Sequence, residues 1–128
     1  MLSKKSIILI ILSLFLAGCG QATGQAGDPA AGDELFHRKN IASAPGCTTC
    51  HSTEQDKVIV GPSLAGVAKR ARVRIQGKTS EEYLRDCILD PNQYVVEGFP
   101  SGVMYQNYKE LLTEDQLSDL VAYLSTLE

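Results

Sequence analysis

Two cysteines and a histidine lie close together in the segment GCTTCHS, which covers residues 46–52. Cys47 and Cys50 are separated by two residues, and His51 follows directly. This arrangement is typical of covalent haem attachment, in which each cysteine sulfur joins a vinyl group of the ring as a thioether and the adjacent histidine points at the iron. The same cysteines could also form a redox-active dithiol or half of a zinc site. The motif therefore predicts one of three kinds of site.

The two alternatives to haem find little support elsewhere in the chain. A thioredoxin-like dithiol lies at the start of a helix within a βαβ pattern, and the sequence shows no such pattern. A structural zinc ion takes four ligands, commonly from two cysteine pairs, whereas the further candidates His37 and Cys87 are single and far apart. We therefore expect one covalently bound haem c.

The first eighteen residues have the features of a secretory signal. Lys4 and Lys5 form a basic start, and the apolar run from Ile7 to Ala17 is shorter than the roughly 20 residues that a membrane-spanning helix needs. The ending LAGC, residues 16–19, resembles the lipobox of bacterial lipoproteins. This resemblance implies cleavage before Cys19 and a diacylglycerol on its thiol. The alternative is an ordinary signal peptide followed by a chance cysteine.

The leader predicts where the protein is found. We expect an exported bacterial protein that is anchored to a membrane through the lipid on Cys19 and faces the periplasm or the cell exterior. Residues 19–28 are small and polar, so they should form a flexible tether with a mean reach of roughly 15 Å. Residues 29–128 are enough for one domain. The compartment is oxidising, but the odd number of remaining cysteines argues against a pure disulfide framework.

The charge of the mature chain excludes one class of partner. Removal of residues 1–18 takes away two lysines and no acids, which leaves 10 basic and 15 acidic residues. Nucleic acid is therefore not an expected partner, because phosphate binding needs a basic face. Five basic residues nevertheless cluster without an intervening acid: Lys69, Arg70, Arg72, Arg74 and Lys78. This basic segment is either a solvated loop or a patch that docks an acidic redox partner or balances haem carboxylates.

Local start signals predict helices. Asp28 and Pro29 provide an N-cap and a first-turn proline for the first helix. The second helix begins at Thr79, which forms a capping box with Glu82, and ends before Pro91.

The third helix is the clearest, and it completes an all-α prediction. Thr113 forms a capping box with Gln116, and the apolar residues that follow share one helical face: Leu117, Leu120, Val121 and Leu124. Residues 54–67 and 92–108 carry turn formers without a period, so both are predicted loops. Gly32 costs the first helix about 1 kcal/mol relative to alanine, which suggests that another helix approaches closely there. With so few apolar side chains, the fold needs a bulky apolar group such as haem at its centre.

Four segments resemble class I cytochrome c, and the likeness covers about residues 29–128. They are GDELF (32–36), CTTCH (47–51), GPSL (61–64) and DLVAYLSTL (119–127). The resemblance implies three main helices and loops wrapped around one covalent haem, with the terminal helices in close contact. It also implies that Cys47 and Cys50 bind the haem and that His51 is the proximal iron ligand. The carbonyl of Pro62 would orient the histidine.

Met104 is the methionine that remains after removal of the leader, and it lies 53 residues beyond His51. By the same resemblance Met104 is the sixth iron ligand, and a thioether ligand raises the reduction potential. Met104 could instead fill an apolar gap, and His37 could supply a second histidine ligand. However, His37 follows Phe36 directly, so it points about 100° away from the face that Phe36 uses.

Some features depart from the family pattern. Tyr105 stands where the family often has a proline after the axial methionine, and the chain has no tryptophan to hold a haem propionate. The candidate substitutes are Tyr94, Arg72, Arg74 and Gln76. Cys87 lies outside the motif, on the buried face of the second helix, where it is most simply a small apolar residue. A reactive or cross-linking thiol is the alternative.

Together these features predict a membrane-tethered electron carrier with a single haem, which is not an enzyme and has no small-molecule substrate. With His51 and Met104 both on the iron, no coordination position is left for a substrate. The resemblance implies redox proteins as partners, namely a quinol-oxidising complex and a terminal oxidase or photosynthetic reaction centre. The alternatives are a fixed haem subunit of a larger respiratory complex and a haem-based ligand sensor or peroxidase.

Overall fold

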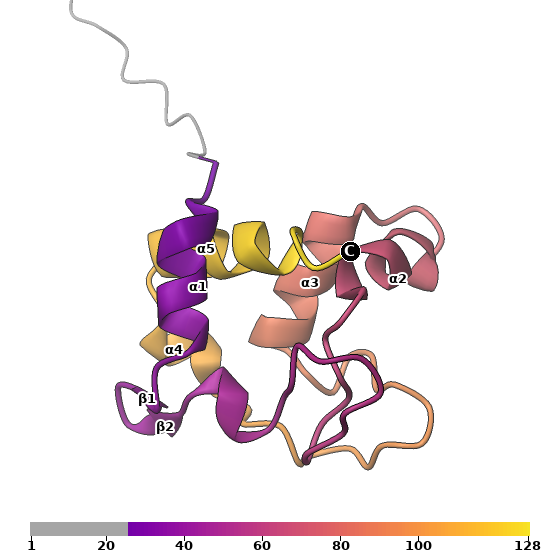
Figure 1. The fold of residues 1–128 in the computed structure, drawn as a ribbon, viewed down its shortest axis with the longest axis horizontal. Helices are drawn as coiled ribbons and strands as arrows, with labels where there is room; N and C mark the ends of the chain where they lie inside the picture. The colour runs from indigo at the N-terminus through magenta and orange to yellow at the C-terminus, as the bar shows by residue number, and fades with distance from the viewer. Residues whose placement is uncertain (1–25) are drawn as a thin grey trace, which may run out of the picture.

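The computed structural model describes residues 26–128. The predicted signal, Cys19 and most of the predicted tether lie outside the described residues. The elements follow one another in the order α1 (Pro29–Phe36), β1 (Asn40–Ile41), β2 (Ala44–Pro45), η2 (Cys47–Thr49), α2 (Val67–Arg74), α3 (Ser80–Leu89), α4 (Tyr108–Leu111) and α5 (Glu114–Leu124) (Figure 1). In this part of the chain the strands are two residues each and form one antiparallel pair, so the all-α prediction is confirmed.

Both predicted capping boxes start a helix. The side chain of Thr79 accepts a hydrogen bond from the amide of Glu82 at 3.2 Å, and the Glu82 carboxylate accepts one from the amide of Thr79 at 2.8 Å. Thr113 and Gln116 repeat this exchange at the start of α5. The two contacts satisfy amides that have no partner in the first turn of a helix. This explains why α3 and α5 begin where the sequence predicts.

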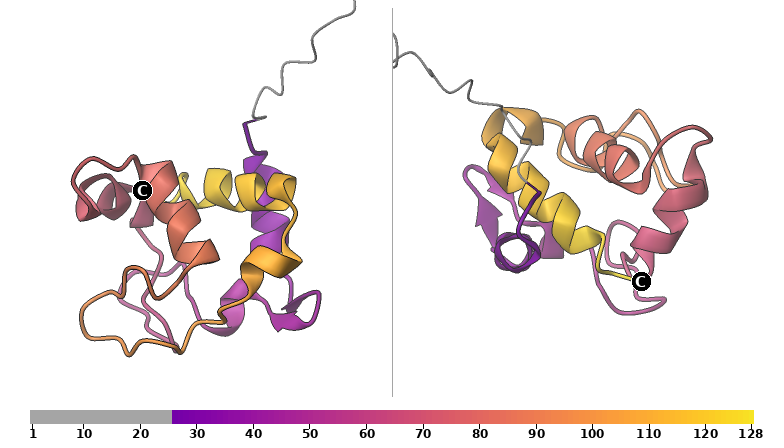
Figure 2. Two further views of the ribbon diagram at one scale, coloured as in Figure 1. Left: turned by 180° about the vertical axis from the view of Figure 1, so that it is seen from behind. Right: turned by 90° about the horizontal axis from the view of Figure 1, so that it is seen from above.

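The terminal helices α1 and α5 cross at close contact (Figures 1 and 2). A Cβ atom on Gly32 would lie 2.0 Å from the carbonyl oxygen of Asp119 and 2.8 Å from the Cβ of Tyr123, so only glycine fits. The rings of Phe36 and Tyr123 pack with their centroids 5.3 Å apart. The amide of Asp28 donates to Oδ1 of Asp119 at 2.7 Å. The close approach predicted from the propensity cost of Gly32 is confirmed.

Helix α2 is an element that the sequence analysis did not predict, and it replaces the solvated loop proposed for the basic segment. The buried residues of α2 are Val67, Ala68 and Ala71, which are small and give a weak apolar pattern. Its N-cap is Gly66, with φ 66°, and no side chain caps the helix. The amide of Ala68 donates to the carbonyl of Leu127 at 3.1 Å. Tertiary contacts rather than local signals therefore hold α2 in place.

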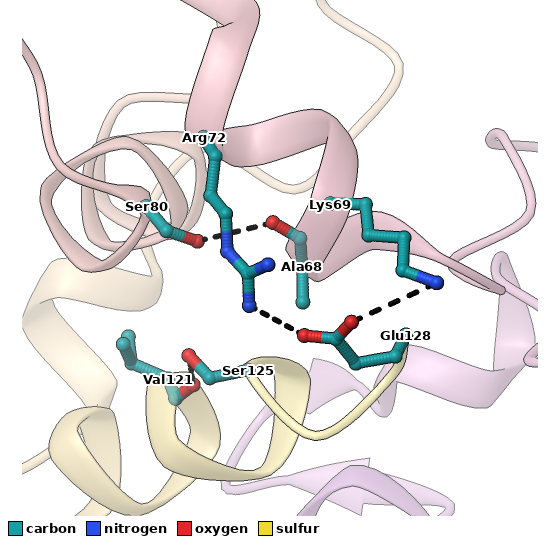
Figure 3. A network of polar contacts seen from close by, with 7 residues as sticks. All are labelled: Ala68, Lys69, Arg72, Ser80, Val121, Ser125 and Glu128. Atoms are coloured by element: carbon teal, nitrogen blue, oxygen red, sulfur yellow. Dashed lines mark hydrogen bonds and ion pairs between the residues drawn. The ribbon is translucent and has the colours of Figure 1, made fainter.

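Polar contacts join α2 to its neighbours (Figure 3). Lys69 and Arg72 both pair with the carboxylate of Glu128, and Nζ of Lys69 lies 3.7 Å from Oε2. The hydroxyl of Ser80 donates to the carbonyl of Ala68 at 3.4 Å. Exposed ion pairs of this kind contribute only about 0–1 kcal/mol each. The apolar contacts of α2 therefore hold it more strongly than its ion pairs do.

The other basic side chains of the segment also have partners. Arg70 donates to the carbonyl of Ser63 at 2.8 Å. The remaining two contacts are Arg74 with Tyr94 and Lys78 with Asp86. The side chains of the basic segment thus mainly form hydrogen bonds and ion pairs within the molecule.

Two long stretches without regular structure pass below α2 and α3 in Figure 1, one before α2 and one between α3 and α4. They contain most of the two predicted loops, although α2 begins at the last residue of the first and α4 at the last residue of the second. Within residues 26–128, no helix combines the length and the apolar character that crossing a membrane requires.

We expect Gly32→Ala to destabilise the folded protein, although alanine favours helix formation. The new Cβ would meet the carbonyl of Asp119. Overpacking of this kind costs about 1–3 kcal/mol, whereas the propensity gain is about 1 kcal/mol. Denaturant unfolding measures the difference. The control is Ala30→Leu at an exposed position of α1, which should change the unfolding free energy by less than about 0.5 kcal/mol. Equal stability of Gly32→Ala and the natural protein would contradict the close crossing.

Candidate functional site

A cavity of about 330 Å³ lies between the helices and the two long loops. This volume falls in the range of cofactor and small-molecule sites, roughly 300–1,000 Å³. Apolar walls come from three helices: Phe36 of α1, Leu84 and Ile88 of α3, and Leu120 and Leu124 of α5. The helices that form the core therefore also form the site.

The cysteine motif turns around one wall of this cavity. Cys47 begins η2, and its carbonyl accepts hydrogen bonds from the amides of Cys50 at 3.1 Å and His51 at 2.9 Å. All three side chains line the cavity. Gly46 allows the segment before the motif to pass close to the backbone after α1, because a Cβ there would lie 1.7 Å from the carbonyl oxygen of Arg38. Burial raises the pKa of Cys47 to about 11, so its thiol is protonated at neutral pH.

The imidazole of His51 is oriented by the loop that follows the motif. Its Nδ1 donates to the carbonyl of Pro62 at 2.8 Å, which leaves Nε2 as the ring nitrogen with a free lone pair. Burial lowers the pKa of His51, against a smaller opposing effect of the Pro62 carbonyl, so the ring is neutral and suited to bind a metal. Gly61 makes room for the ring, since a Cβ there would lie 2.4 Å from Cε1. The expected contact between Pro62 and His51 is present in the structure.

Met104 lines the same cavity from the loop between α3 and α4, and its side chain is partly buried. His37, the competing axial candidate, does not line the cavity. Its side chain is 52% exposed, and Nδ1 lies 3.0 Å from both the carbonyl and a carboxylate oxygen of Asp33. The structure thus brings Met104 to the site and leaves His37 outside it.

The residues considered for a haem propionate fall into two groups. Tyr94 lines the cavity, and Nη1 of Arg74 donates to its hydroxyl at 3.3 Å. Arg72 instead pairs with Glu128, and Gln76 is exposed. Only the Arg74–Tyr94 pair therefore stands beside the cavity.

Cys87 also faces the cavity, from α3, and is partly rather than fully buried. Burial raises its pKa, so the thiol is neutral around pH 7. This agrees with a small apolar residue, although it contacts the site as well as the core.

Tyr108 is a site residue that the sequence analysis missed. It is buried and lines the cavity, and its hydroxyl donates to the carbonyl of Pro45 at 2.6 Å. Its ring packs edge-on against Tyr105 with centroids 5.1 Å apart. The only local signal was the spacing of the two tyrosines, i and i+3, in a stretch without helical period. The hydrogen bond to a carbonyl 63 positions away leaves no trace in the sequence.

The groups around the cavity fit a haem. Sulfur and neutral imidazole nitrogen are iron ligands of c-type haems, and the apolar walls suit a macrocycle. The zinc alternative lacks a ligand set, because residues 26–128 contain no group of three His, Cys, Asp or Glu side chains that could hold a metal. The dithiol alternative lacks its scaffold, because η2 is a single 3-10 turn outside any βαβ unit.

The residues of this site match a known protein family. The family described as Cytochrome c matches residues 29–128, which include the whole lining of the cavity. The chain is also 26% identical, over an alignment of 148 positions including gaps, to cytochrome c2 of Rhodopseudomonas palustris (strain ATCC BAA-98 / CGA009). That alignment covers 98% of this chain and 99% of the relative.

We expect Gly61→Ala to disturb the His51 ring without preventing haem attachment, because the cysteines are unchanged. The new Cβ would lie 2.4 Å from Cε1, so the ring or the loop must move. The visible spectrum and the reduction potential should both shift.

Gly27→Ala is the matched control for this substitution. Its Cβ would lie 2.0 Å from the carbonyl oxygen of Ser118, at a position that does not line the cavity. It should lower stability and leave the spectrum unchanged. Unchanged spectra in both variants would contradict the placement of Gly61 against His51.

Proposed function

The chain belongs to the cytochrome c family, and on this premise we propose that it shuttles single electrons between redox complexes at a membrane. Proteins of this family carry electrons on a covalent haem c, which fits the cavity of this chain. The observation that carries the proposal is the gathering of Cys47, Cys50, His51 and Met104 on one apolar cavity. When bound, the haem supplies an iron that cycles between the ferric and ferrous states.

Four residues of the chain would hold the haem. Cys47 and Cys50 would supply the thioether sulfurs, since the single 3-10 turn between them leaves both on the lining of the cavity. Nε2 of His51 would bind the iron, because Nδ1 is engaged by the carbonyl of Pro62. The sulfur of Met104 would be the other iron ligand from the chain, since Met104 lines the cavity and His37 does not.

This ligand set explains why we assign the protein no catalytic reaction and no small-molecule substrate. With the His51 imidazole and the Met104 thioether as iron ligands, the chain itself would leave no iron position open to a substrate. The protein then sets the reduction potential through ligand identity, hydrogen bonding and exclusion of water. A sensor or peroxidase would need such a position to be open.

We further propose that the partners are redox proteins, a quinol-oxidising complex as donor and a terminal oxidase or photosynthetic reaction centre as acceptor. Val60 and Val103 line the cavity and are about half exposed, at 47% and 50%. Val58 and Ile59 extend this exposed apolar rim. A small exposed apolar rim suits the small and transient interfaces of electron-transfer encounters. The charges of the basic segment are engaged within the molecule and are less suited to this role.

The membrane tether is part of the proposal. Its support is the apolar run that ends in LAGC, residues 16–19, and the polar stretch that separates Cys19 from α1. A lipid on Cys19 would keep the domain within a few nanometres of membrane-bound partners, which raises its local concentration.

We expect Met104→Ala to keep the covalent haem and to lose the methionine–iron bond. The ferric protein should then lose its weak charge-transfer absorption in the red, its potential should fall, and carbon monoxide should bind the ferrous form rapidly. His37→Ala is the matched control and should change none of these. A normal red band and potential in Met104→Ala would exclude Met104 as a ligand.

We expect Cys19→Ser to release the protein from membranes, because the serine hydroxyl replaces the thiol that would carry the lipid. Membrane and soluble fractions of the producing cells, probed for covalent haem, provide the measurement. Cys87→Ser is the control and should stay with the membrane. Membrane association of the Cys19→Ser protein at the natural level would exclude lipid anchoring through Cys19.

A further inference from the structure

The loop that bears Met104 is long and has few internal constraints. It runs from Asp90 to Asn107, between α3 and α4, without helix or strand. Loops of this length are uncommon in compact domains unless they have a function. Gly98 and Gly102 have positive φ angles of 88° and 76°, which allow sharp changes of direction on the approach to Met104. An axial ligand on such a loop needs something to hold it toward the cavity.

Two side-chain amides connect the backbone on either side of Met104. The amide N–H of Gly102 donates to Oδ1 of Asn92 at 2.8 Å. Nδ2 of Asn92 donates to Oε1 of Gln106, and Nε2 of Gln106 donates to the carbonyl of Met104 itself. The three hydrogen bonds form one continuous chain from Gly102 to Met104, through two side chains 14 positions apart in the sequence.

The donor-to-acceptor direction of these three hydrogen bonds determines which side chains can form them. The chain of bonds starts at a backbone donor and ends at a backbone acceptor, so each intermediate group must accept at one end and donate at the other. A carboxamide does both, whereas an ionised carboxylate only accepts. Aspartate at position 92 would keep the bond to Gly102 and lose the bond to Gln106. Glutamate at position 106 would lose the bond to the carbonyl of Met104.

A second attachment lies on the other side of Met104. The ring of Tyr105 packs on Tyr108, whose hydroxyl donates to the carbonyl of Pro45, two residues before Cys47. Tyr105 itself does not restrict the backbone as a proline would. The tyrosine pair thus connects the loop to the segment before the cysteine motif. The side-chain amides of Asn92 and Gln106 connect the backbone of the loop at Gly102 and Met104.

We propose that Asn92 and Gln106 are positioning residues that clamp the Met104 loop and hold the methionine sulfur on the iron. This inference rests on the proposed ligation by Met104. Without the clamp, the loop spends more time away from the cavity, and outside ligands compete more successfully for the iron. Asn92 lines the cavity and Gln106 does not, so an effect of Gln106→Glu on the lifetime of the methionine bond cannot come from a lost contact with the haem.

The test uses the intact haem protein and the variants Asn92→Asp, Gln106→Glu and the double variant. Imidazole is the probe, and its affinity for the ferric protein is read together with the red charge-transfer absorption. Loss of one or two hydrogen bonds corresponds to about a tenfold rise in imidazole affinity. Each single variant should show this rise with a weaker red band. The double variant should show little more, because the two amides act in series.

Two controls separate the clamp from charge and general stability. Gln93→Glu introduces the same charge at an exposed position one residue from Asn92, and should bind imidazole as the natural protein does. Gly27→Ala should unfold more easily without gaining imidazole affinity. Imidazole affinity in Gln106→Glu equal to that of the natural protein would overturn the clamp, as would an equal rise in Gln93→Glu.

Failure of the proposed ligation has a different signature. If Met104 is not an iron ligand, the natural protein lacks the red charge-transfer band, or Met104→Ala keeps that band. Both outcomes are measured without any clamp variant. Where the band is present and depends on Met104, the clamp variants test the inference alone. Hydrogen exchange of the Gly102 amide gives an independent readout, because Asn92→Ala removes its acceptor and should speed exchange several-fold. Unchanged exchange there would overturn the clamp even if imidazole affinity rose.

Discussion

The apolar cavity between the terminal helices and the two long loops is the constraint on which the rest of the structure depends. The cavity of about 330 Å³ opens to solvent beside Val60 and Val103, so without a cofactor its apolar walls would face water. Apolar surface that stays in contact with water forgoes roughly 25 cal/mol per Å² of burial free energy. A covalent haem recovers this free energy by filling the space with apolar surface. The thioether bonds make the filling permanent, which lets a chain with short helices and few aromatic residues enclose so large a volume.

Close backbone approaches around the cavity follow from this constraint. Gly32 lets α1 and α5 cross at contact distance, and Gly61 lets the loop after the motif press against the imidazole of His51. The carbonyl of Pro62 then selects the ring tautomer and holds its plane. For the iron ligation that we propose for His51, a fixed imidazole suits single-electron transfer, because little of the protein must rearrange when the charge of the iron changes.

Polar side chains outside the cavity mainly hold loops and short helices in position. The ion pairs of Lys69 and Arg72 with Glu128 join α2 to the segment that follows α5, and Arg70 anchors the loop at Ser63. Around Met104 the same task falls to the amides of Asn92 and Gln106 and to the tyrosine pair. The exposed surface beside the site is instead apolar at Val58, Ile59 and Val103. Charged side chains therefore mainly form contacts within the molecule. Exposed apolar side chains lie beside the cavity, where a partner would approach the cofactor.

The sequence by itself determined the features that depend on neighbouring residues. The haem motif, the capping boxes at Thr79 and Thr113 and the apolar face of α5 are all encoded within a few positions, because a turn or a helix brings those positions together. The helix-propensity cost of Gly32 indicated that another helix approaches closely there.

Only the tertiary structure decided the rest. Helix α2 has small buried residues and no side-chain cap, so its stability comes from contacts with distant segments that no local pattern records. Tyr108 and Pro45 are 63 positions apart, and Asn92 and Gln106 are 14 apart. Their hydrogen bonds exist only once folding has brought the segments together. The position of the partly buried Met104 beside the cavity was decided in the same way, by the packing of whole elements around one central space.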